Sequence, residues 1–438
     1  MEKTRGFYFV ALLVSLVGLS PPLAAGEGIK PSPPEGQGAS EKVLEAPLLP
    51  LQDLIEEAKR ANPEIQAARR RVEAAWARVP QARALPDPMV SLGYMNESFT
   101  RLTLGSSEMA RLDLSFSQEI PFPPKLSLKG GITAKEAERE EEVLRATELE
   151  VISRLKVAYY DLFFVEKSIG IVEKNKDLLE KFAKTAEARY AVGKAVQQDV
   201  LRAQTEITIL LQRLAQLERE RGSLRAAINS LLNRPREAPL GRPVEPPRRK
   251  LPFPLEQLVN LALERSPDVK ATERSLERNG LALDLAKKQY YPDFTIGTGY
   301  TNRGRLEGMW QVMVGVTVPL YFKKKQDYGV REAIADLSSA QENLQAVRQS
   351  LFFGIKDLFL TAETSERLLT LIGTGTLPQA ALTLESSIAS YAVGKVDFLT
   401  LLTNLLNVLN QELQYYQELA NFEKALARLE RVVGVSFD

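Results

Sequence analysis

Cysteine and histidine are both absent from the 438 residues of this chain. Without cysteine there is no disulfide framework, no thiolate nucleophile and no acceptor for an N-terminal lipid. Without histidine the chain lacks the most common general base near neutral pH and one of the usual soft metal ligands. These absences exclude every Ser-His-Asp and Cys-His mechanism. The sequence also has no glycine-rich phosphate loop, so we expect neither enzyme activity nor a cofactor.

An excess of either charge is missing too, because 57 basic residues stand against 56 acidic ones. A chain without a basic excess has no electrostatic footprint for nucleic acid, so we expect no nucleic-acid partner. Long apolar runs are absent after residue 25, and no later segment predicts a transmembrane helix. If this chain crosses a membrane, it must do so as strands.

The first 25 residues have the anatomy of a secretory signal peptide. Lys3 and Arg5 give a basic start, residues 7–19 form an apolar run, and small residues ending at Ala25 predict the cleavage site. A transmembrane anchor is the alternative, but the run is shorter than the roughly 20 residues that a span needs. Residues 26–50 are rich in proline and glycine, which predicts a flexible tether.

An internal repeat organises the rest of the chain. The run YAVGK at residues 190–194 returns letter for letter at residues 391–395, about 200 residues later. Three further pairs keep the same order and nearly the same spacing: Asn62-Pro63 with Ser266-Pro267, Pro86-Asp87 with Pro292-Asp293, and Ile120-Pro121 with Val318-Pro319. We therefore predict a tandem duplication, with a first repeat at 51–233, a Pro-rich linker at 234–254 and a second repeat at 255–438.

Each repeat has the same predicted layout of two shorter helices, two short strands, and two long helices joined by a turn at a glycine. Residues 126–191 contain no proline, which allows roughly 100 Å of continuous helix. Helices in globular proteins average about 11–12 residues, so a helix of this length predicts a coiled coil or a helical barrel. The charge cluster at residues 138–142 is interpreted as a solvated helix face and not as a catalytic carboxylate pair.

The predicted strands alternate between apolar and polar residues. The apolar residues expected on one face are Leu112, Leu114 and Phe116 in residues 111–120, and Trp310, Val312, Val314 and Val316 in residues 310–318. Such runs of about ten residues are typical of a barrel with a lipid-facing outside and a wet lumen, and a soluble β-sandwich is the alternative. Four strands cannot close such a barrel, since known ones begin at about eight. Either the chain oligomerises or these strands do not span a membrane.

The signal peptide, the duplicated helix–strand–strand–helix plan and the Tyr-x-x-Gly turn between long helices together resemble the TolC-like outer-membrane efflux protein family. The resemblance covers residues 51–434. The run GKVDFLTLL at 394–402 resembles the subgroup that serves heavy-metal and related resistance-nodulation-division (RND) pumps, and LERVVG at 429–434 is similar to the family's C-terminal helix end.

The resemblance implies a mainly α protomer with a small β part, assembled as a homotrimer. Each chain would give four strands to a twelve-stranded β-barrel in the outer membrane and its long helical hairpins to a periplasmic α-barrel. The implied partners are outer-membrane lipid, a periplasmic adaptor protein and an inner-membrane pump. The implied function is a passive efflux duct from the periplasm to the exterior, with no cofactor.

The resemblance also implies two kinds of functional residue in the long hairpins. The residues expected to contact the adaptor lie in the two turns: Val192, Gly193, Lys194, Val393, Gly394 and Lys395. The residues expected at a pore constriction are Asp199, Asp397, Thr400 and Thr403. Threefold symmetry would make each aspartate a ring of like charges, which raise one another's pKa and attract cations. Simple helix capping is the alternative for the glycines and for Asp397.

Two other functions stay open at this point. A type I secretion duct or another export duct would have the same fold and a different pump. A periplasmic coiled-coil adaptor or a soluble coiled-coil scaffold belongs to a different class. Adaptors carry one hairpin between lipoyl-like segments, so two duplicated hairpins with amphipathic strand pairs argue against that class.

Overall fold

The computed structural model describes residues 48–437, so the predicted signal peptide and most of the predicted tether lie outside the described residues. One order of elements occurs twice. The first copy contains α1 (Leu51–Ala61), α2 (Pro63–Arg83), β2 (Met89–Met95), β3 (Arg111–Ile120), α3 (Pro123–Ala191) and α4 (Gln197–Leu231). The second contains α5 (Leu255–Arg265), α6 (Pro267–Lys288), β5 (Asp293–Arg303), β6 (Leu306–Thr317), α7 (Gln326–Leu371), the π-helical η1 (Ile372–Thr376), α8 (Leu377–Ala392) and α9 (Phe398–Val433). Two short strands, β1 (Leu48–Leu49) and β4 (Arg242–Pro243), pair in parallel beside α3.

In both copies the second helix begins at the same sequence pattern, a polar residue followed by proline. Pro63 and Pro267 occupy the first position of α2 and α6, where a missing N–H costs nothing. Asn62 caps α2, because its Oδ1 accepts hydrogen bonds from the backbone N of Glu64 at 2.9 Å and of Ile65 at 3.3 Å. The chain therefore turns sharply between the two shorter helices at the points that the prolines predict.

The long helices differ between the copies. Helix α3 runs unbroken for 69 residues, or roughly 100 Å. In the second copy the corresponding path stays helical, but the π-helical turn η1 divides it into α7 and α8. Gly373 and Gly375 weaken the helix locally, and Pro378 has no N–H to donate to the preceding turn. Among residues 48–437, no helix combines the length and the apolar character that a membrane span requires.

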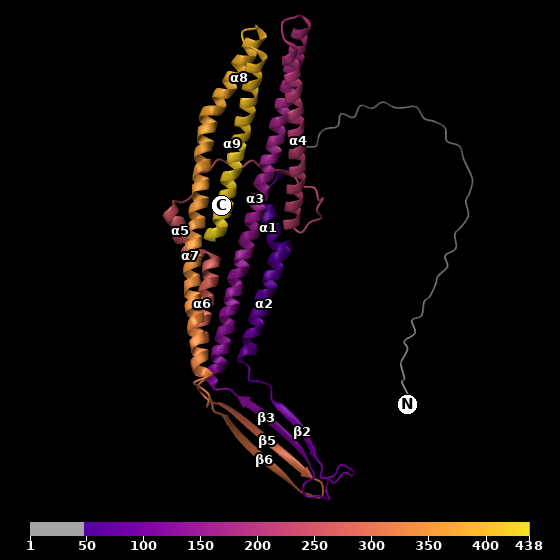
Figure 1. The fold of residues 1–438 in the computed structure, drawn as a ribbon, viewed down its shortest axis with the longest axis vertical. Coiled ribbons are helices and arrows are strands. Elements are labelled where there is room, and N and C mark those ends of the chain that lie inside the picture. The colour runs from indigo at the N-terminus through magenta and orange to yellow at the C-terminus, as the bar shows by residue number, and fades with distance from the viewer. Residues whose placement is uncertain (1–47, 438) are drawn as a thin grey trace, which may run out of the picture. The chain divides into compact units, whose positions relative to one another are not determined.

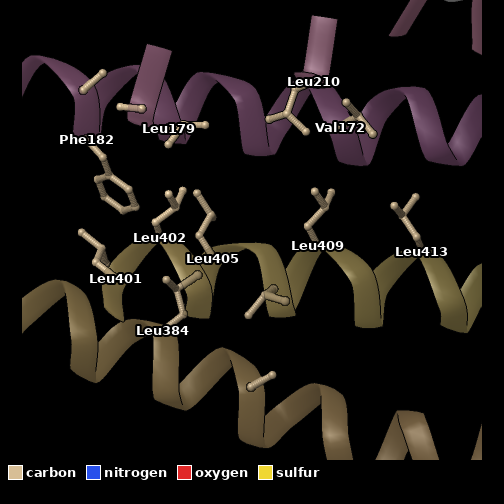
Figure 2. Close-up of a cluster of buried hydrophobic side chains, with 14 of the residues drawn as sticks. Val172, Leu179, Phe182, Leu210, Leu384, Leu401, Leu402, Leu405, Leu409 and Leu413 are labelled. Atoms are coloured by element: carbon tan, nitrogen blue, oxygen red, sulfur yellow. The ribbon is translucent and has the colours of Figure 1, made fainter. Parts of the chain in front are cut away.

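The two copies are packed together along their helices (Figure 1). Helix α6 of the second copy lies against α3 of the first, which gives neighbours in the order α2, α3, α6 and α7. Nearer the turns, α9 packs against α3, α7 and α8. Figure 2 shows α9 between α3 and α8, where leucines fill the space between the helices. The buried side chains there include Leu179, Phe182, Leu210, Leu384 and Leu402.

The four longer strands form one antiparallel sheet in the order β2-β3-β5-β6. The central pair, β3 with β5, joins the two copies. Strands β2 and β6 are the two edges, and in the part of the chain that the structure describes each has one side without a neighbouring strand. Figure 1 shows the sheet at the opposite end of the long helices from the two glycine turns.

A buried ion pair fixes the junction between the helices and the sheet. The Lys125 Nζ, whose side chain is 4% exposed, lies 2.9 Å from the carboxylate of Asp293 and donates to the Tyr291 carbonyl at 2.9 Å. The backbone N of Phe122 donates to the same carboxylate at 2.8 Å. The Phe122 and Tyr291 rings stack with centroids 4.7 Å apart. The start of α3 in the first copy is therefore held against the start of β5 in the second.

Candidate functional site: the hairpin tips and the strand face

The two turns between long helices have the same backbone geometry. Gly193 and Gly394 adopt positive φ angles of 73° and 76°, a left-handed conformation that glycine takes without steric cost. In the first turn, the backbone N of Gly193 donates to the Tyr190 carbonyl at 2.9 Å. In the second, the backbone N of Gly394 donates to the Tyr391 carbonyl at 3.0 Å. The repeated glycines are thus explained by the shape of the turn itself.

The turns at Gly193 and Gly394 form the tips of the two helical hairpins. Residues of both tips line one pocket of about 790 Å³. Arg189, at the end of α3, connects them, because its Nη2 donates to the Ala392 carbonyl at 3.2 Å. Its guanidinium also lies over the Tyr391 ring, 4.5 Å from the centroid. The predicted tip residues Lys194, Val393 and Gly394 line this pocket, whereas the role of Arg189 was missed. The sequence does hold a signal for Arg189. The residue before the YAVGK run is arginine in the first copy and Ser390 in the second, so the two tips differ at this position.

The predicted constriction residues lie at the starts of α4 and α9. Asp397 is the N-cap of α9, and its Oδ1 accepts a hydrogen bond from the Thr400 backbone N at 2.8 Å. Hydrogen bonds from the Thr400 side chain and backbone lower the pKa of the Asp397 carboxyl, and the charge of Arg202 adds to this. The contacts that Asp397 makes are therefore those of a helix cap, the alternative to a role in a pore constriction. Its carboxylate is nevertheless exposed, as are Thr400 and Thr403.

Asp199, the first-copy counterpart, lies in the first turn of α4 and is partly exposed. Its backbone N donates to the Val196 carbonyl at 3.1 Å. Asp199 and Asp397 line the same pocket, so the structure brings the two predicted acids to neighbouring parts of the tips. Thr403 turns its hydroxyl back to its own helix and donates to the Leu399 carbonyl at 2.8 Å.

The strand register places all seven predicted apolar residues on one face of the sheet. Leu114 pairs with Leu92 and Tyr300, and Tyr300 pairs in turn with Trp310. The other rows on this face contain Leu112, Phe116, Val312, Val314 and Val316. Most of these side chains are exposed in the single chain, with Trp310 at 78% and Val314 at 68%. The sheet therefore presents an apolar face that none of the other described residues, 48–437, covers.

The opposite face of the sheet is made mainly of small and polar residues. Asp113 accepts hydrogen bonds there from the Thr301 hydroxyl at 2.6 Å and from Arg111 Nε at 3.0 Å. This face is less uniformly polar than the alternation predicts, because four exposed methionines also stand on it: Met89, Met95, Met309 and Met313. Across residues 48–437, no three His, Cys, Asp or Glu side chains are placed to hold a metal ion together.

The whole arrangement matches solved outer-membrane channel structures. The outer membrane protein VceC of Vibrio cholerae superposes with a TM-score of 0.77 over 89% of this chain and 97% of that chain, at 18% identity. The open state of the Neisseria gonorrhoeae MtrE outer membrane channel gives a TM-score of 0.75 over 89% of each chain, at 16% identity. The fold is therefore mostly helical with few strands and of the TolC-like channel type.

The sequence profile described as "outer membrane efflux protein" matches residues 54–234 and again residues 258–435. The chain belongs to the outer membrane efflux protein family, which confirms the predicted resemblance. Among its relatives is the cobalt-zinc-cadmium resistance protein CzcC of Cupriavidus metallidurans. The two are 23% identical over 395 residues, which cover 88% of this chain and 90% of the relative.

Proposed function

We propose that this protein is the outer-membrane channel subunit of a tripartite efflux pump, a passive duct that carries substrate from the periplasm to the exterior. The observation that carries the proposal is the four-stranded sheet with one uncovered apolar face and two open edges. Open edges and large exposed apolar faces promote association unless something covers them. Lipid would cover the apolar face, and neighbouring copies of the chain would pair with β2 and β6.

The number of copies follows from how many strands a closed barrel needs. Two chains would supply eight strands, the smallest known number, and three would supply twelve. The family resemblance favours three. The long helices support assembly as well, because α4 exposes Leu201 and Leu211 while α7 exposes Phe353 and Leu360. Apolar side chains on these two helices would be buried between neighbouring chains of a helical barrel.

In this proposal the signal peptide at 1–25 exports the chain, and the tether at 26–50 leads to the two repeats, 51–233 and 255–438, separated by the linker at 234–254. The apolar strand face lies in the outer membrane, and the long helices extend into the periplasm. The tips around Gly193 and Gly394 dock a periplasmic adaptor, which connects the duct to an RND-type inner-membrane transporter. Similarity to CzcC favours a pump for heavy-metal ions.

Assembly is the direct test of this proposal. Native mass spectrometry of the detergent-solubilised protein should show three chains per particle, and membrane fractionation should place the protein with the outer membrane. A monomer that stays in solution without detergent would contradict the proposal, because its apolar strand face would then need no lipid.

A further inference from the structure

The two copies differ sharply in charge near their tips. When Gly193 is aligned with Gly394, residues 171–210 correspond to residues 372–411. The first segment contains thirteen charged residues and the second only three, Glu385, Lys395 and Asp397. Charged residues make up 26% of the whole chain, so the second hairpin is strongly depleted in charge. A helix surface facing bulk water ordinarily carries charges of both signs.

The difference is concentrated on one exposed stripe of α9. Spacings of three and four residues place its members on one side of the helix: Thr400, Thr403, Asn407, Asn410 and Gln414. The same positions in α4 are Asp199, Arg202, Glu206, Ile209 and Arg213. Four charged side chains of the first copy are thus replaced by hydroxyl and amide groups in the second. The opposite side of α9 is a buried row of leucines (Figure 2).

The amide side chains of this stripe have no hydrogen-bond partner among the described residues of the protomer. Within residues 48–437, the side chains of Asn407, Asn410 and Gln414 make no hydrogen bond, and all three are exposed. Helix α9 lies between α3 and α8 of its own chain, so the stripe does not belong to the outer edge of the helical layer. The apolar residues available for packing against other copies lie on α4 and α7 instead. The stripe is therefore polar and open to solvent, although it lacks the charges of a surface that faces bulk water.

We infer that the α9 stripe is an uncharged, hydrogen-bonding part of the lining in the narrow part of the duct, so that the second copy adds no preference there for ions of either sign. The inference rests on the proposed function and deepens it. Around a threefold axis every charged side chain would appear three times, and like charges held together repel one another and retain counter-ions. Amides both donate and accept hydrogen bonds, so they hydrate cations and anions alike. The substrates that suit this stripe are polar and hydrated, and the stripe does not select them by the sign of their charge.

Placing charges on the stripe tests this lining. Asn407→Asp and Gln414→Glu would each put three carboxylates around the axis. In planar bilayers with a potassium chloride gradient, each should raise the ratio of potassium to chloride permeability by about threefold or more. Gln204→Glu is the matched control, because Gln204 is an exposed amide of α4 whose second-copy counterpart, Leu405, is buried and off the stripe. It should leave the ratio unchanged. Equal effects at Gln414 and Gln204 would overturn the inference, provided that native mass spectrometry shows intact trimers.

Chemical access to the stripe gives a second measurement. The chain has no native cysteine, so Asn410→Cys introduces a single reactive thiol. A cationic and an anionic methanethiosulfonate reagent should both reduce the current, at comparable rates. Failure of both reagents would show that protein covers the stripe, and a strong preference for the cationic reagent would show a charge-selective lining; either result overturns the inference. Absence of any ion current through wild-type trimers would instead contradict the proposed duct itself.

Discussion

At the scale of single residues, Asp397 stabilises the start of α9 by accepting the Thr400 backbone hydrogen bond. Asp397→Ala removes that acceptor, which costs about 0.5–2 kcal/mol locally. Because Lys395 lies two residues away in the tip turn, limited digestion with trypsin should cut there faster in the Ala variant. Asp397→Asn retains a capping oxygen and should be cut at the wild-type rate. Equal cleavage of the Ala and Asn variants would mean that the cap does not hold the tip together.

A second prediction at this scale concerns the buried contact between α3 and α9. The Lys156 Nζ lies 2.6 Å from Glu430 Oε2, and the side chains are 4% and 6% exposed. Glu430→Gln removes a buried negative charge beside a buried ammonium and should destabilise the fold by roughly 3 kcal/mol. Glu150→Gln is the control. Glu150 pairs with Arg431 at 2.9 Å, but the two side chains are 44% and 35% exposed. It should cost less than about 1 kcal/mol.

The thermal unfolding temperature in detergent measures both variants. Similar shifts in unfolding temperature for Glu430→Gln and Glu150→Gln would show that burial does not increase the effect of the Lys156–Glu430 pair on stability. Sequence reasoning did not find this pair, since Lys156 and Glu430 are 274 residues apart and each looks like an ordinary charge on a long helix. Only the packing of α9 against α3 brings them out of water.

At the scale of elements, local sequence patterns predicted the features that depend on neighbouring residues, namely helix starts, strands and turns. The prolines at 63 and 267 marked helix starts, the period of two marked the strands, and the repeated glycines marked the turns. The pairing of β3 with β5 and the packing of α6 against α3 join distant parts of the chain, so no local pattern contains them. The interruption at η1 depends on how two glycines and Pro378 act together within a long helix, which the overall repeat hides.

The strand face gives a prediction at the element scale. Val314 lies on the apolar face and pairs with Ile296, whereas Gln311 lies on the opposite face of the same strand. Val314→Arg should cost about 2–4 kcal/mol if the apolar face meets hydrocarbon. Gln311→Arg should cost less, because in the proposed barrel the face that carries Gln311 would meet water. The yield of folded trimer in each variant checks this, and equal losses would mean that the two faces were assigned wrongly.

At the scale of the whole molecule, the proposed trimer depends on apolar side chains that residues 48–437 of a single chain leave uncovered. Phe353 is 72% exposed on α7, and Leu360 lies two turns further along the same side. Phe353→Asp should weaken each contact between copies by about 2 kcal/mol, since a buried phenylalanine side chain contributes about 1.5–3 kcal/mol. The fraction of trimer in native mass spectra should fall as the protein is diluted. Gln341→Asp, at an exposed polar position on another side of α7, should leave that fraction unchanged.

The two glycine turns of each chain have a consequence for symmetry. A trimer of a duplicated chain presents six tips around its rim, so its threefold axis is also an approximate sixfold axis. A partner that binds only the shared YAVGK turn would meet six equivalent positions. A partner that also contacts Arg189, or Ser390 at the matching position, would meet three. In the proposed trimer, the number of adaptor chains around the duct would therefore depend on how far the two halves of the sequence have diverged.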